Sequence, residues 1–175
     1  MRRFLLFAPL LAFLAFVVLV TVYLRAPSDP RIRSHLIGRA LPEFTLAAAV
    51  PSHPPLTSAD LRRGEPRLLN IFASWCGPCV TEAPQLLALK RRGIPVDAIA
   101  IRDRSEDVAA FLARYGDPFA RIGSDPNTRV QIALGSSGVP ETFVVDGRGI
   151  IRHQHIGPIT DRNLPEILAA YEAAR

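Results

Sequence analysis

Residues 67–79 decide the fold, and they read Arg-Leu-Leu-Asn-Ile-Phe-Ala-Ser-Trp-Cys-Gly-Pro-Cys. The apolar run from Arg67 to Ser74 predicts a short buried β-strand. The stretch Pro78–Arg92 has a helical pattern and is followed by a glycine, as helices often are. Cys76 and Cys79 are therefore expected between a strand and the N-terminus of a helix.

This position favours redox chemistry for the two cysteines. The free N–H groups and the dipole at a helix N-terminus stabilise an anion, so a thiolate at Cys76 is expected to be favoured. Cys79 follows within one turn and can resolve a mixed disulfide, while Pro78 suits the first turn of a helix. A purely structural disulfide is the alternative, but closing so short a loop removes little entropy from the unfolded chain.

Composition and charge exclude several classes of protein. Of the 175 residues, 49% are hydrophobic and 21% are charged, which excludes an intrinsically disordered chain. The formal net charge is +5, but Arg2, Arg3 and Arg25 flank an N-terminal apolar run, and the remaining charges nearly balance. We therefore expect no nucleic-acid partner. Two cysteines in all exclude a multi-disulfide scaffold and a four-cysteine zinc site.

The N-terminal segment predicts a membrane anchor. Phe4–Leu24 contains no charged residue and, as a helix, would be roughly 31 Å long, close to the ~30 Å hydrocarbon core. The run is longer than the apolar region of a signal peptide and lacks a small-x-small cleavage site, so residues 1–25 are interpreted as an uncleaved transmembrane helix. Arg2 and Arg3 favour a cytoplasmic N-terminus, which places the rest of the chain in an oxidising space.

The remaining sequence predicts a linker at 26–39 and one α/β domain at 40–175. Its mixed central sheet is expected to carry helices on both faces. Besides the first strand and helix, we expect strands at Glu43–Ala48, Val96–Ile101, Thr142–Val145 and Ile150–His155, a helical turn at Ser58–Arg63, and helices at Glu106–Tyr115 (capped by Ser105), Pro126–Leu134 and from Thr160 or Asp161 to about Ala174. Residues 146–149, Asp-Gly-Arg-Gly, predict a hairpin.

The motif Trp75-Cys76-Gly77-Pro78-Cys79 resembles the active site of the thioredoxin superfamily. Pro84 and the pair Val139-Pro140 match two further prolines of that pattern. The resemblance implies a thioredoxin fold with Gly77 and Pro78 in the active-site loop. It also implies that Val139-Pro140 is a cis-proline loop against the disulfide, where the Val139 backbone binds an extended substrate beside Trp75.

A narrower resemblance is to the DsbE/CcmG family, thiol:disulfide interchange proteins of cytochrome c maturation. It rests on the apolar N-terminal run, read as a membrane anchor, and on residues 41–46, 68–76 and 138–143. The resemblance implies a single-pass protein of the bacterial inner membrane with its domain in the periplasm. It also implies that the protein reduces the disulfide of apocytochrome c before haem attachment, that its partner is apocytochrome c or the haem-ligation machinery, and that a transmembrane donor of CcdA or DsbD type re-reduces it. No cofactor or metal is expected beyond the redox-active disulfide.

The same family pattern suggests the acid–base groups. Asn70 stands where thioredoxin has a buried aspartate, so the proton acceptor for Cys79 must be another residue. Glu82, one turn after Cys79, is the family's candidate, although a solvated acid on a helix face is the alternative. Glu141, beside Pro140, is a second acid that could contact substrate.

Two other functions remain open from the sequence. One is a TlpA- or ResA-like anchored thioredoxin for copper-site assembly or general disulfide reduction. The other is a non-catalytic module that binds copper or protein, for which the i, i+2 pair His153 and His155 is a candidate, although a polar strand face is the commoner explanation. A peroxiredoxin is disfavoured, because neither cysteine lies in a Pro-x-x-x-Thr-x-x-Cys sequence.

Overall fold

The computed structural model describes residue 9, residues 12–21 and residues 34–175. The chain divides into two units, Met1–Arg31 and Ile32–Arg175.

Residues 12–21 of the first unit are helical, and their side chains are largely exposed. Among the described residues, no helix is both long and apolar enough to cross a membrane. The predicted anchor at 4–24 and the linker at 26–39 lie partly outside the described residues, so both stay predictions.

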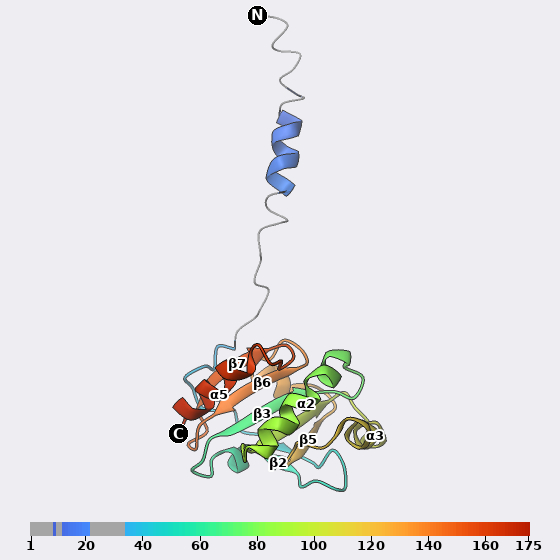
Figure 1. Ribbon diagram of the computed structural model, residues 1–175, viewed down its shortest axis with the longest axis vertical. Coiled ribbons are helices and arrows are strands. Elements are labelled where there is room, and N and C mark those ends of the chain that lie inside the picture. Colours follow the sequence, from blue (N-terminus) through green and yellow to red (C-terminus); the bar gives the residue numbers. More distant parts are fainter. Residues whose placement is uncertain (1–8, 10–11, 22–33) are drawn as a thin grey trace, which may run out of the picture. The chain divides into compact units, whose positions relative to one another are not determined.

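The second unit is built on a five-stranded mixed sheet in the order β5-β4-β3-β6-β7 (Figure 1). β3 pairs in parallel with β4, and β4 in parallel with β5, whereas β6 and β7 are antiparallel additions. The strands are β3 (Arg67–Phe72), β4 (Val96–Ile101), β5 (Ile122–Asp125), β6 (Glu141–Val145) and β7 (Ile151–Ile156). The mixed sheet, the β6–β7 hairpin and the thioredoxin-like arrangement are therefore confirmed.

The helices follow the predicted order with shifted ends. They are η1, a 3₁₀ helix (Ser58–Leu61), α2 (Gly77–Arg91), α3 (Ser105–Tyr115), α4 (Arg129–Ala133) and α5 (Leu164–Ala173). The prediction that Ser105 caps α3 is wrong: Ser105 is the first helical residue, and the N-cap is Arg104, which makes no side-chain capping bond. The acidic residues Glu106 and Asp107 in the first turn still suit the helix dipole.

The two faces of the sheet have different covers. Figure 1 shows α2 and α5 lying across one face, and Asn70 and Thr142 on that face are hydrogen-bonded to each other. On the opposite face lies a second, two-stranded sheet formed by β1 (Thr45–Leu46) and β2 (Leu56–Thr57). A Cβ added at Gly123 of β5 would lie 2.8 Å from Leu46 and 3.1 Å from Leu56, so this packing needs a glycine.

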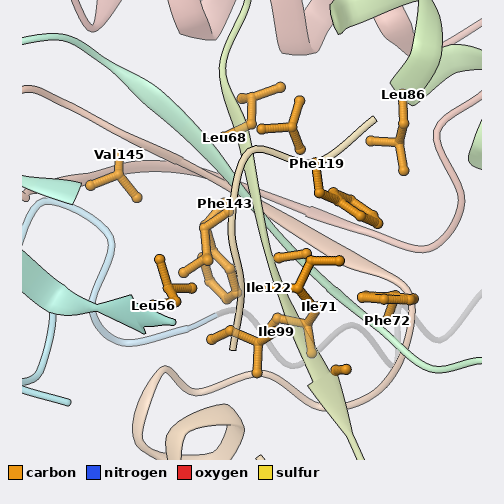
Figure 2. Packing of buried hydrophobic residues seen from close by; sticks show 14 of the residues in the cluster. Leu56, Leu68, Ile71, Phe72, Leu86, Ile99, Phe119, Ile122, Phe143 and Val145 are labelled. Carbon is orange, nitrogen blue, oxygen red and sulfur yellow. The ribbon is translucent and has the colours of Figure 1, made fainter. Parts of the chain in front are cut away.

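Buried apolar side chains from the strands and from the elements that cover the sheet form one hydrophobic core. Figure 2 labels ten members of this core, and four of them, Leu56, Ile99, Ile122 and Phe143, are 0% exposed. Phe72 at the end of β3 contacts the rings of Phe111 and Phe119, with centroids 5.6 and 5.0 Å away. Strands β2 and β5 were not predicted. Leu56–Thr57 is only two residues long, and Ile-Gly-Ser-Asp at β5 has the composition of a turn.

The sheet brings two distant loops to one edge. In the antiparallel register of β3 and β6, Ile71 pairs with Glu141. The end of β3 therefore lies beside the start of β6, so the loop that leads to Cys76 and the loop that contains Val139-Pro140 meet at the same edge.

Candidate active site

Cys76 and Cys79 form a disulfide at the N-terminus of α2. Cys76 is the N-cap of the helix, and its Sγ accepts the backbone N–H of Cys79 at 3.2 Å. The structure thus gives the sulfur the amide donor that the sequence predicted. In the disulfide form both cysteines are buried, since Cys76 is 4% exposed and Cys79 is 2% exposed.

The loop before the disulfide is hydrogen-bonded to the segment that connects β4 to α3. The Asp103 carboxylate accepts the Ser74 N–H at 2.5 Å and the Ser74 hydroxyl at 2.6 Å. The Trp75 indole N–H donates to the Arg102 carbonyl at 3.2 Å, while the ring is 58% exposed. Trp75 is therefore an exposed aromatic surface held in a fixed position beside the cysteines.

Glu82 is fully buried, which contradicts the interpretation of a solvated acid on a helix face. Its Oε1 accepts a hydrogen bond from Asn70 Nδ2 at 3.0 Å, and its Oε2 accepts the Ile159 N–H at 3.1 Å. Burial raises the pKa of Glu82 to about 7, against the smaller opposing effects of the Ile159 and Asn70 hydrogen bonds. The group can therefore take up or release a proton near neutral pH.

A small cavity joins Glu82 to the disulfide. It has a volume of about 10 Å³, close to the space one water needs, and Asn70, Cys79 and Glu82 are among its lining residues. Asn70 is fully buried and donates to both Glu82 and Thr142, but its Oδ1 has no hydrogen-bond partner among the described residues. Cys79 and the carboxyl group of Glu82 thus line the same small cavity, whose other walls are mainly apolar.

The Val139–Pro140 peptide bond is cis, as the resemblance implied. Glu141, which follows it, is 1% exposed, and its carboxylate contacts the chain itself. Oε1 accepts the Ser137 N–H and hydroxyl, both at 2.8 Å, and the Gly138 N–H at 3.1 Å, while Oε2 accepts Gln154 Nε2 at 2.9 Å. In this structure the Glu141 carboxylate therefore holds Ser137 and Gly138, in the loop before Pro140, by hydrogen bonds.

The histidine pair shows no ligand geometry. His153 Nε2 lies 3.8 Å from Glu166 Oε1, and His155 Nε2 lies 3.4 Å from the Pro158 carbonyl. Within the described part of the chain, no three side chains of metal-binding type are grouped together. The pair therefore lends no support to the copper-binding hypothesis.

Sequence reasoning missed three supporting residues: Asp103, Thr142 and Ile159. Asp103 had a usable signal, because it follows strand β4, whose carboxyl end lies beside that of β3 in a parallel pair. Thr142 and Ile159 had none, since their contacts join positions 72 and 77 residues apart in the sequence.

Comparison with known proteins agrees with this site. The Redoxin family model matches residues 36–171. Thiol:disulfide interchange protein HelX of Rhodobacter capsulatus is 38% identical over 92% of this chain and 91% of its own length. DsbE of Vibrio cholerae is 35% identical over 97% of this chain and 94% of its own. The chain belongs to the Redoxin family and, within it, to the DsbE thiol:disulfide interchange proteins.

A solved structure of a DsbE-type protein from Chlorobium tepidum supports the same assignment. It superposes with a TM-score of 0.66 at 26% identity, covering 82% of this chain and 99% of the other. This DsbE-family chain is a thiol:disulfide oxidoreductase, and its Cys76–Cys79 disulfide lies at the N-terminus of α2.

We predict that Glu82→Gln removes a pH-dependent part of the stability. Folding raises the pKa of Glu82 from 4.5 to about 7, so the folded state binds the proton more tightly than the unfolded chain. The resulting stabilisation is complete below pH 4.5 and is lost as the pH rises through 7. Urea unfolding of the oxidised protein should show this loss, on the order of 1–3 kcal/mol, in wild type and not in Glu82→Gln.

Glu65→Gln is the matched control, because it changes an exposed glutamate of the same domain. Its pH profile of unfolding should follow that of wild type. Parallel profiles for wild type and Glu82→Gln would contradict the prediction.

Proposed function

We propose that this chain reduces the disulfide of an apocytochrome c before haem is attached. The observation that carries the proposal is the buried Cys76–Cys79 disulfide, placed at a helix N-terminus and at the same sheet edge as the cis Val139–Pro140 bond. The DsbE and HelX names of the relatives support a role in cytochrome c maturation. The substrate is then the disulfide of a Cys-x-x-Cys-His segment.

The first step uses the reduced form of the protein. The Cys76 thiolate attacks one sulfur of the substrate disulfide, the substrate S–S bond breaks, and a mixed disulfide forms. The departing substrate thiolate takes up a proton. The Cys79 N–H, which contacts Cys76 Sγ, and the positive end of the α2 dipole stabilise the attacking thiolate.

The second step releases the product. The Cys79 thiol loses its proton and attacks Cys76 Sγ, which re-forms the Cys76–Cys79 disulfide, and the second substrate sulfur leaves and is protonated. Two electrons and two protons have then passed to the substrate. The protein is left in the oxidised form that the structure shows.

Glu82 is the group we assign to the proton of Cys79. Both residues line the same small cavity, and the pKa of Glu82 is raised to about 7 by burial, so its carboxylate can accept a proton at neutral pH. Asn70, fully buried and hydrogen-bonded to Oε1, keeps the carboxyl group in place and cannot itself titrate.

Substrate binding is assigned to the surface around the disulfide. The half-buried Val139 has no hydrogen bond to its backbone within the described residues, which suits the addition of an extended peptide strand. Trp75 directly precedes Cys76, and its exposed ring supplies apolar contact area for the substrate.

The cycle needs a reductant from outside the oxidising compartment. The apolar run 4–24 and Arg2 and Arg3 support a single-pass inner-membrane protein with residues 40–175 in the periplasm. Electrons for the Cys76–Cys79 disulfide then come from a transmembrane dithiol protein of CcdA or DsbD type.

We predict that Cys79→Ser accumulates a mixed disulfide through Cys76, because the resolving thiol is missing. Mass spectrometry of complexes isolated from the native host under non-reducing conditions should identify an apocytochrome c or a protein of haem ligation. Cys76→Ser is the control and should trap little, since the remaining Cys79 lacks the N-cap position.

Two results would contradict the proposal. Capture of copper-site assembly proteins alone would favour the TlpA- or ResA-like function. Absence of any reducible adduct of Cys79→Ser would favour a binding module without catalysis.

We predict that Glu82→Gln slows the release of reduced product while leaving the fold intact. The amide keeps the shape of the side chain but cannot accept a proton, so removal of the Cys79 proton falls to solvent. General-base catalysis of this kind is worth about 10²-fold or more. Stopped-flow measurement of mixed-disulfide decay tests this, with Glu65→Gln as the control; equal decay rates in Glu82→Gln and wild type would contradict the role.

We predict that the native protein fractionates with the membrane. Its domain should resist protease added to intact cells and become sensitive once the outer compartment is opened. Isolation of a soluble mature protein that begins near residue 26 would show that the apolar run is a cleaved signal peptide.

A further inference from the structure

Ser34 begins the described part of the domain and is 5% exposed. Residues 38–41 pair with residues 149–151, at the start of the edge strand β7. Backbone hydrogen bonds join Gly38 to Ile151 at 2.7 Å and Leu41 to Gly149 at 2.8 Å. Main-chain hydrogen bonds therefore join the segment that follows Ser34 to the β6–β7 turn and the start of β7.

The hydroxyl of Ser34 holds the start of the loop that leads to the cis-proline. Ser34 Oγ donates to the carbonyl of Leu134, the C-cap of α4, at 2.6 Å and accepts the Leu36 N–H at 3.1 Å. Gly135 follows with φ 71°, and a Cβ there would lie 2.8 Å from Ser34 Oγ and 3.2 Å from Ser34 Cα. The loop and Ser34 are therefore in direct contact.

The backbone of Ser34 holds the other end of the same loop through two side chains. Its N–H donates to Gln154 Oε1 at 2.6 Å, and Gln154 Nε2 donates to Glu141 Oε2 at 2.9 Å. Glu141 Oε1 in turn accepts the N–H groups of Ser137 and Gly138. One residue thus reaches both ends of the segment 134–138.

This segment lies outside the β-sheet; main-chain hydrogen bonds to α4 hold residues 134–136, whereas side chains hold Ser137 and Gly138. The Gly138 carbonyl accepts hydrogen bonds from Gln131 Nε2 at 3.1 Å and from Ser136 Oγ at 3.2 Å. Val139 comes next in the chain, directly before the cis bond to Pro140. A change in how the segment is held will therefore move the backbone that precedes the substrate-binding position.

We propose that Ser34 is a positioning residue for substrate binding, because it holds the loop 134–138 in the position that presents the Val139 backbone to an extended substrate. The inference rests on the proposed function in that Val139 meets a peptide disulfide. It adds that the segment around Ser34, which precedes β1, contributes to recognition of that peptide. Ser34 does not act on the sulfur atoms themselves.

A purely structural role for Ser34 predicts a different result. Loss of any buried hydroxyl lowers stability, whereas a positioning role affects only substrates long enough to reach Val139. Ser58 offers a matched comparison: it is 2% exposed, and its hydroxyl donates to Glu43 Oε2 at 2.6 Å and accepts the Phe44 N–H at 3.4 Å, two partners outside the loop 134–138.

The experiment measures oxidation of the reduced full-length chain by two disulfides. One is a synthetic peptide with a Cys-x-x-Cys-His disulfide, and the other is cystamine, which is too small to reach Val139. For Ser34→Ala, the half-saturating peptide concentration should rise about threefold to tenfold, the effect of one lost hydrogen bond. The limiting rate with peptide, the rate with cystamine and the reduction potential should equal those of wild type.

A second variant and the control sharpen the test. Gln154→Met removes both hydrogen bonds of the linking side chain and should raise the half-saturating concentration similarly, with less than additive effects in the double variant. Ser58→Ala should lower the unfolding midpoint without changing the response to peptide.

Three outcomes would overturn the inference. An unchanged half-saturating concentration in Ser34→Ala would show that Ser34 does not position the loop. An equal loss with peptide and cystamine would indicate a structural role alone. A wild-type chain that reduces neither disulfide would contradict the proposed function, and this inference with it.

Discussion

The carboxyl group of Glu82, buried without a cation, is the constraint on which the centre of this domain depends. Removing a carboxyl group from water is costly unless polar groups replace the lost hydration. Here the replacement comes from Asn70 on β3 and from the Ile159 N–H before α5, and Asn70 also donates to Thr142 on β6. One side chain thereby ties the active-site helix to two strands and to the entry of the last helix. Among the described residues no basic side chain forms an ion pair with it, so the environment favours the protonated form more than a salt bridge would allow.

A second buried glutamate, Glu141, differs from Glu82 in the number of hydrogen-bond donors around its carboxylate. Glu141 is as well buried as Glu82, but it accepts four hydrogen bonds, three of them from Ser137 and Gly138. That arrangement fixes the geometry of a loop. Glu82 accepts two and shares a cavity with Cys79, so its proton affinity is governed by burial. Glu141 begins β6, whereas Glu82 lies on α2 and lines the same cavity as Cys79.

Local patterns predicted the parts of the site that local physics determines. The strand–Cys-x-x-Cys–helix sequence predicted the disulfide and its N-cap geometry, and Asp146-Gly147 predicted the β6–β7 hairpin. The burial of Glu82 could not be predicted in this way, because its donor Ile159 lies 77 residues away in the sequence. Strand β5 was missed for a related reason: its Gly123 reads as a turn residue, but it is required by the packing of Leu46 from the second sheet. Long-range packing decides both cases, and a single sequence carries no signal for it.

The helix N-terminus also bears on the direction of electron flow. A dithiol whose reduced form is strongly stabilised is an oxidant, because its thiolate is a good leaving group. In this chain Pro78 has no N–H, and the hydrogen bond to Cys76 Sγ comes from the amide of Cys79. In the disulfide form Cys76 Sγ thus accepts one amide N–H at the positive end of the helix dipole, and among the described residues no basic side chain is paired with it. The proposed reduction of a substrate disulfide requires a thiolate with few such stabilising contacts, because a reduced form that is only weakly stabilised gives up its electrons more readily.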